Sequence, residues 1–97
     1  MSVMVLLEAP VKAEKISNMK SYLAELLPDT RAYDGCRGMD VYFDTEHEGN
    51  MVVVEHWQSR PHHEKYLGWR TETGVMDKLG AMLAGPPSIR YFERAGA

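Results

Sequence analysis

The fold is decided around one stretch, MVVVEHWQSRP, residues 51–61. Its first seven residues are rich in β-branched and aromatic side chains, which predicts a strand over Met51–Trp57. Ser59 is a suitable N-cap, and Pro61 fits the first helical turn, where its missing N–H would have no partner. The stretch therefore predicts a strand that leads directly into a helix, which we expect to continue to about Thr73.

The rest of the chain alternates between the same two kinds of element. Apolar residues at helical spacing follow Lys12 and again follow Gly74, and Pro28 and the Gly85-Pro-Pro87 run are expected to stop these helices. Three further stretches read as strands: Val3–Glu8, Cys36–Asp44 and Ser88–Arg94. The order βαββαβ predicts one domain over residues 1–97, α+β in class, with a ferredoxin-like antiparallel sheet and helices on one face. The first and third strands should be central.

The two central strands predict a partner chain. Val3–Glu8 and Met51–Trp57 carry apolar side chains on both faces, which calls for cover on both faces of the sheet. Two helices on one side can cover only one of them. A second copy packed sheet against sheet would cover the other, so we expect a homodimer that forms a dimeric α+β barrel.

Composition excludes several classes of protein. The 97 residues carry a net charge of −3, which argues against a nucleic-acid partner. No apolar run is long enough for a membrane span, and the N-terminal residues do not look like a signal peptide. The single cysteine, Cys36, fits a reducing, cytoplasmic location. We find no nucleotide-binding or nucleophile-elbow motif, and the four histidines lack the close spacing of a metal site.

Three stretches together resemble the antibiotic biosynthesis monooxygenase family: the valine-rich strand ending Glu55-His-Trp57-Gln-Ser59, the later run Tyr66-Leu-Gly-Trp69-Arg70, and residues 27–36 before the second strand. The resemblance implies a homodimeric α+β barrel with a pocket between sheet and helices. It also implies oxidation of a quinol or hydroxylated aromatic by O₂ without metal or flavin. The chain also departs from the family, since Tyr66 stands where many relatives have histidine.

Oxidation without a cofactor needs aromatic walls, a base that works near neutral pH and polar groups that steady developing charge. Strand alternation puts Val53, Glu55 and Trp57 on one face, which by analogy with the family we place toward the helices. On the next helix, one of two stripes should face the sheet: His62, Tyr66 and Trp69, or His63, Leu67 and Arg70. The candidate catalytic residues are therefore His63, Tyr66 and His62, and the candidate substrate-binding residues are Trp57, Glu55, Trp69, Arg70 and Val53.

Each candidate also has an ordinary structural interpretation. Trp57 could simply fill the core, and histidines in a first helical turn are usually solvated. Glu55 could be a buried base or the ion-pair partner of Arg70 or Arg90, and we favour the ion pair. The residues also leave two other functions open. One is an isomerase or lactone-processing enzyme on the same scaffold, and the other is a non-catalytic binding or stress-response module.

Overall fold

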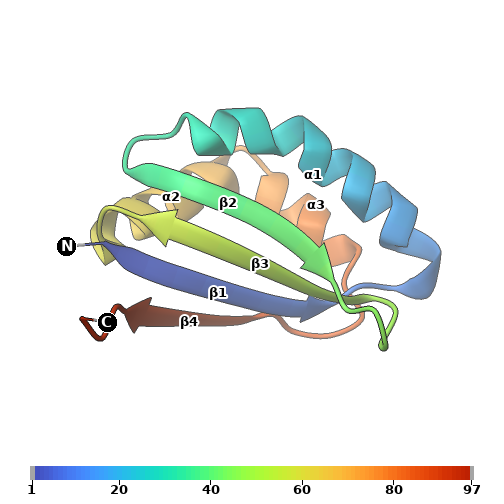
Figure 1. Ribbon diagram of the computed structural model, residues 1–97. Helices are drawn as coiled ribbons and strands as arrows, with labels where there is room; N and C mark the ends of the chain where they lie inside the picture. Colours follow the sequence, from blue (N-terminus) through green and yellow to red (C-terminus); the bar gives the residue numbers. More distant parts are fainter. Residues whose placement is uncertain (1, 97) are drawn as a thin grey trace.

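The computed structural model describes residues 2–96 (Figure 1). Its elements, in chain order, are β1 (Val3–Pro10), a short 3₁₀ turn η1 (Ala13–Lys15), α1 (Ile16–Arg31), β2 (Cys36–Phe43), β3 (Asn50–Trp57), α2 (Arg60–Glu72), α3 (Val75–Ala81) and β4 (Ser88–Glu93). The order of elements predicted from the sequence is confirmed. The break between α2 and α3 also falls as expected, because Gly74 adopts φ +82° at the N-cap of α3.

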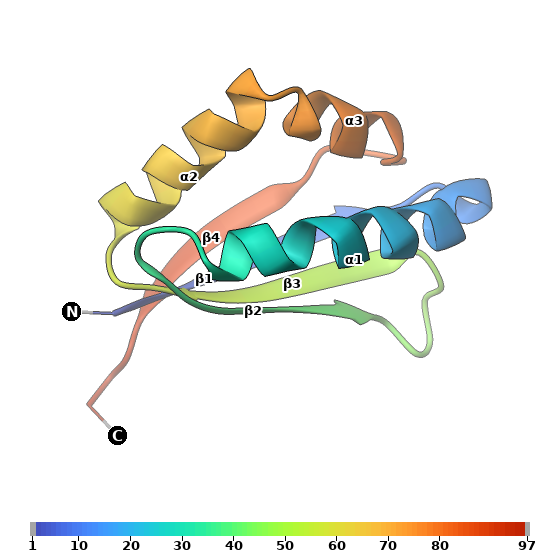
Figure 2. The same cartoon turned by 90° about the horizontal axis from the view of Figure 1, so that it is seen from above.

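The four strands form one antiparallel sheet in the order β2-β3-β1-β4, which confirms that β1 and β3 are central. The helices lie on one side of this sheet (Figure 2). The α+β ferredoxin-like class is therefore confirmed. The register sets one row of side chains across three strands: Glu55 of β3 is opposite Val5 of β1, and Val5 is opposite Tyr91 of β4.

Helix α1 extends beyond the predicted end. Pro28 was expected to stop it, but the helix includes Pro28 and continues to Arg31. Contacts from α2 hold this last turn, since Arg70 Nη2 donates hydrogen bonds to the Leu26 carbonyl oxygen at 3.1 Å and to Thr30 Oγ1 at 2.9 Å. Tertiary bonds thus offset the backbone bond that a proline removes, and they place Thr30 in the core, where it is 1 % exposed.

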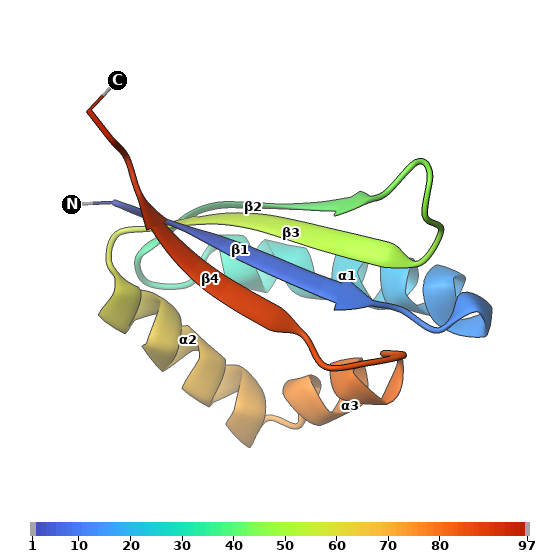
Figure 3. The same ribbon diagram turned by 90° about the horizontal axis from the view of Figure 1, so that it is seen from below.

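The helices cover only one of the two faces of the sheet. Alternate residues of β3, from Met51 to Trp57, are buried beneath the helices. The opposite face carries a second apolar set, and no described element covers it. This set, called the open sheet face below, consists of Met4, Leu6, Val52, Val54, Tyr42 and Phe92. Figure 3 shows the chain after β4 leaving the sheet on the side opposite α2 and α3.

Among residues 2–96, no helix has the length and apolar character needed to cross a lipid bilayer.

Candidate active site

An apolar cavity of about 330 Å³ lies between the sheet and the helices. This volume falls at the lower end of the range for small-molecule sites, roughly 300–1,000 Å³. Its walls come from all three longer helices and from every strand, and most of them are leucine, methionine and other aliphatic side chains. Only three polar side chains of the described residues reach the lining: Thr30, Glu55 and Tyr66. Any chemistry in the cavity therefore depends on these groups and their partners.

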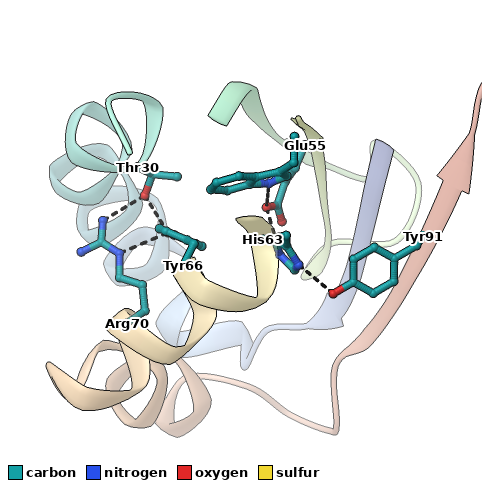
Figure 4. A network of polar contacts seen from close by, with 7 residues as sticks. Thr30, Glu55, His63, Tyr66, Arg70 and Tyr91 are labelled. Atoms are coloured by element: carbon teal, nitrogen blue, oxygen red, sulfur yellow. Dashed lines mark hydrogen bonds and ion pairs between the residues drawn. The ribbon is translucent and has the colours of Figure 1, made fainter. Parts of the chain in front are cut away.

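Glu55 is a buried carboxylate, with 2 % of its surface exposed. Its Oε1 accepts a hydrogen bond from Trp57 Nε1 at 2.9 Å and lies 3.5 Å from His63 Nε2 (Figure 4). Its Oε2 makes no hydrogen bond to any residue within 2–96. A cavity-lining carboxylate held by one oxygen, with the other available, is a suitable acceptor for a ligand proton.

His63 connects Glu55 to the edge of the sheet. Its ring is 1 % exposed, and its Nδ1 lies 2.7 Å from the hydroxyl oxygen of Tyr91. The register explains this geometry, because Glu55 and Tyr91 flank Val5 in the row across β3, β1 and β4. Burial raises the pKa of the Tyr91 phenol, so this hydroxyl keeps its proton at neutral pH and can donate it to His63.

A second polar group lies at the α1–α2 contact. The hydroxyls of Thr30 and Tyr66 are 2.6 Å apart, and both oxygens accept hydrogen bonds from Arg70, at 2.9 Å from Nη2 and 3.1 Å from Nε (Figure 4). The two hydroxyls have two protons between them, and only one is used in their mutual bond. The other proton is available to donate to a ligand oxygen, since both residues line the cavity.

Aromatic rings pack around the Tyr66 side chain of this polar group. The rings of Trp57 and Tyr66 have centroids 5.0 Å apart, and Tyr33 lies 5.3 Å from Tyr66. Tyr33 in turn stacks on Trp69 at 5.1 Å. Such contacts fix ring orientations, so the Tyr66 hydroxyl is held in place toward the cavity by packing as well as by hydrogen bonds.

The candidate residues predicted from the sequence fall into three groups. Val53, Glu55 and Tyr66 line the cavity itself. Trp57, His63 and Arg70 lie directly behind the lining and hydrogen-bond to it or contact it. His62 and Trp69 do not line the cavity. His62 hydrogen-bonds to Ser59 and packs on Gly35, and Trp69 stacks on Tyr33.

Two expectations about contacts were wrong. Glu55 does not pair with Arg70 or Arg90: it contacts His63 and Trp57, while Arg90 pairs with Glu8 at 2.9 Å. The first-turn histidine His63 is buried rather than solvated. Tyr91, 28 residues later in the sequence, provides the hydrogen-bond partner that water would otherwise be.

The predicted stripes of α2 also need correction. Neither stripe alone faces the sheet, because the buried residues of α2 are His63, Tyr66 and Arg70, which come from both.

Thr30 and Tyr91 are the residues that the sequence interpretation missed. A helix that stops at Pro28, as the sequence predicts, would leave Thr30 outside it, and the burial of Thr30 depends on α1 running past Pro28. Tyr91 was recognised only as part of a strand, although strand alternation places Tyr91 and Ile89 on the face of β4 that carries the cavity. That alternation was the available signal for Tyr91.

The remaining titratable residues do not add a further site. No three His, Cys, Asp or Glu side chains within residues 2–96 gather in a way that could hold a metal ion. Cys36 is half-buried, and burial raises the pKa of its thiol, which favours the protonated and less reactive form.

The sequence matches the family model of the antibiotic biosynthesis monooxygenases over residues 2–70. This match covers more than half of the chain, so the protein belongs to the antibiotic biosynthesis monooxygenase family. Membership supports a monooxygenase-type function in general terms. No curated protein gives a significant match to the chain.

Several solved structures share the fold of this chain. Rv0793 from Mycobacterium tuberculosis has a TM-score of 0.86 at 23% identity, covering 100% of this chain and 98% of that chain. A candidate antibiotic biosynthesis monooxygenase from Deinococcus radiodurans has a TM-score of 0.84 at 23% identity, covering 98% and 94%. A variant of SnoaB, a cofactor-independent oxygenase from Streptomyces nogalater, has a TM-score of 0.83 at 11% identity, covering 99% and 95%. At these identities the likeness establishes the fold.

Proposed function

We propose that the protein is a monooxygenase that oxidises a quinol or another hydroxylated aromatic with O₂ and needs no cofactor. The observation that carries this proposal is the polar content of the cavity. An otherwise apolar chamber presents a buried carboxylate, Glu55, and a hydroxyl donor, Tyr66 with Thr30. A hydroxylated aromatic ring has an apolar body, a proton to give and an oxygen that accepts hydrogen bonds, so it matches all three features.

The proposed reaction balances in atoms and electrons. Ground-state dioxygen reacts slowly with closed-shell molecules, so the substrate must first become an electron-rich anion by losing a hydroxyl proton. A ring carbon of that anion then bonds to one oxygen atom of O₂, and the hydroperoxide formed loses water to leave a carbonyl. One oxygen atom enters the product and the other leaves as water. All the electrons that reduce O₂ come from the substrate, so no external reductant is required.

The residues have distinct roles in this proposal. Glu55 takes the hydroxyl proton, and Trp57 and His63 hold its other oxygen in place. Tyr66 and Thr30 donate to the oxygen on which negative charge develops. Val53 belongs to the apolar wall that keeps water from the anion.

The test is oxygen uptake by the purified, chelator-treated protein with a panel of reduced naphthoquinols and hydroxyanthrones. We expect uptake above the buffer rate for at least one substrate, with one atom of ¹⁸O₂ in the product and the other in water. Release of hydrogen peroxide without labelled product, or no uptake above buffer across the panel, would refute the proposal. Turnover of the same compounds under argon would favour an isomerase instead.

We also propose that the protein works as a homodimer through the open sheet face. Tyr42 is 57 % exposed and Phe92 is 38 % exposed on this face, and the other apolar residues there are only half-buried. A contiguous exposed apolar surface is typical of an interface. A second copy supplies a matching surface by two-fold symmetry.

This assembly is tested by light scattering after size-exclusion chromatography at micromolar concentration. The wild-type chain should elute at twice its monomer mass, and Leu6→Glu, which places a charge at the centre of the open sheet face, should elute as a monomer. Glu14→Lys, a charge change on η1 away from that face, is the control. A monomeric wild-type protein would contradict the proposal.

A further inference from the structure

Arg70 is a buried cation that has no anionic partner within residues 2–96. Only 4 % of its surface is exposed, and no carboxylate of these residues lies within 4.0 Å of its guanidinium. Its charge instead lies over the ring of Trp69 at 4.3 Å and near that of Tyr66 at 5.5 Å. Because the guanidinium group stays protonated in proteins, a positive charge without an ion-pair partner among the described residues lies next to the cavity. Such a charge is costly when no anion balances it.

The hydrogen bonds of Arg70 lead to two groups that line the cavity. Apart from its bond to the Leu26 carbonyl, its hydrogen bonds end on the hydroxyl oxygens of Thr30 and Tyr66. A hydroxyl that accepts from a cation becomes a stronger donor, and both hydroxyls line the cavity. A ligand atom that accepts the remaining hydroxyl proton is therefore placed in a positive field.

We infer that the cavity binds its aromatic ligand as an oxyanion, with the ionised oxygen on the Thr30–Tyr66 hydroxyl pair and a neutral hydroxyl group directed to Glu55. Glu55 lines the same cavity and repels a second negative charge, so the ionised and neutral ends of the ligand cannot exchange places. The ligand class is thus an acidic aromatic: an ionised phenol or enol, or an aromatic carboxylate, that also carries a separate hydroxyl. This inference rests on the proposed function only in placing a ligand in the cavity and does not depend on oxidation.

Two redox-inert probes test it by calorimetry at pH 7. The first is 6-hydroxy-2-naphthoate, and the second is its neutral isostere 6-hydroxy-2-naphthamide. The wild-type protein should bind the acid at least about tenfold more tightly than the amide, which corresponds to ~1.4 kcal/mol. Arg70→Met should abolish most of this preference, and Arg70→Lys should retain part of it because the charge stays.

Two further variants keep the test sharp. Lys65→Met removes an exposed cation from the same helix and should leave the preference unchanged, because Lys65 is exposed and pairs with the exposed Asp34. Tyr66→Phe removes one hydroxyl while Arg70 keeps its bonds to Thr30 and Leu26, so it should fold even if Arg70→Met does not, and it should reduce the preference several-fold.

A wild-type protein that binds the amide as tightly as the acid, or that binds neither probe at millimolar concentration, would overturn the inference. A folded Arg70→Met variant with an unchanged preference would do the same. These outcomes are separate from the oxygenase test. A preference for the acid without oxygen uptake would support the anion site and refute the proposed reaction. Oxygen uptake without the preference would support the reaction and refute the anion site.

Discussion

Replacing Glu55 by glutamine tests the proposed base with little disturbance to the fold. The amide is close to the carboxylate in size, and its oxygen can still accept the Trp57 Nε1 hydrogen bond, which is 2.9 Å long. Its amino group would face His63 Nε2, and His63 can accept there if its Nδ1 carries the ring proton and donates it to Tyr91. The variant therefore keeps a satisfied network and loses only the negative charge and the ability to take a proton.

The expected effects on stability and rate differ widely. Since no buried polar atom loses its partner, the free energy of unfolding should change by less than about 1.5 kcal/mol. A positioned general base contributes roughly 10²–10⁴-fold to a rate. The turnover number of Glu55→Gln should therefore fall by about that factor, equivalent to ~3–5 kcal/mol in activation free energy.

Oxygen consumption with the fastest quinol of the panel gives the rate, and urea denaturation followed by circular dichroism gives the stability. Glu64→Gln on α2 is the control, because its side chain is 55% exposed and pairs with Arg60. The control should keep wild-type activity. A folded Glu55→Gln variant with a turnover number within threefold of wild type would show that another group takes the proton.

Three further predictions concern stability and titration. Gly35→Ala should lower the free energy of unfolding by about 2–4 kcal/mol in urea, because Gly35 has φ +84° and a Cβ there would lie 2.5 Å from the His62 ring; a loss below 0.5 kcal/mol would contradict this packing. The hydrogen bond from the Glu46 backbone N–H lowers the pKa of Asp44, so its carboxylate stabilises the fold above its unfolded-state pKa. The stability difference between wild type and Asp44→Ala should shrink as pH falls below about 4, and a difference that grows would be inconsistent. Burial raises the pKa of Tyr91, so ultraviolet titration should show a phenol that ionises above the ordinary tyrosine range and disappears in Tyr91→Phe; an unchanged titration curve would argue against it.

Most of the fold could be predicted from the sequence because its signals are local. Alternation along Met51–Trp57, the Ser59 cap and the Gly74 break each depend on neighbouring residues, and the structure has all three. The end of α1 could not be predicted in this way. Pro28 is an ordinary stop signal, and it is overridden by hydrogen bonds from Arg70, which lies 40 residues from Thr30.

The candidate site was only partly accessible to the same reasoning, because its partners are distant in sequence. Val53, Glu55 and Tyr66 were identified from one strand and one helix, and all three line the cavity. The predicted ion-pair partner of Glu55 was wrong, because charge alone suggested an arginine. The observed partner, His63, contacts both Glu55 and Tyr91, which the register places on either side of Val5.

The buried polar residues are better explained by a ligand than by stability. Glu55, His63 and Arg70 are all at most 4 % exposed, and a small domain gains nothing from such groups that aliphatic side chains of similar volume would not supply. Glu55 is acidic and Arg70 is basic, yet they form no ion pair with each other: Glu55 lines the cavity, and Arg70 hydrogen-bonds to Thr30 and Tyr66, which also line it. If Glu55 and Arg70 were present only for stability, a direct ion pair between them would have the lower free energy. The proposed ligand, with a hydroxyl proton to lose to Glu55 and a charged oxygen on the Thr30–Tyr66 pair, accounts for this arrangement.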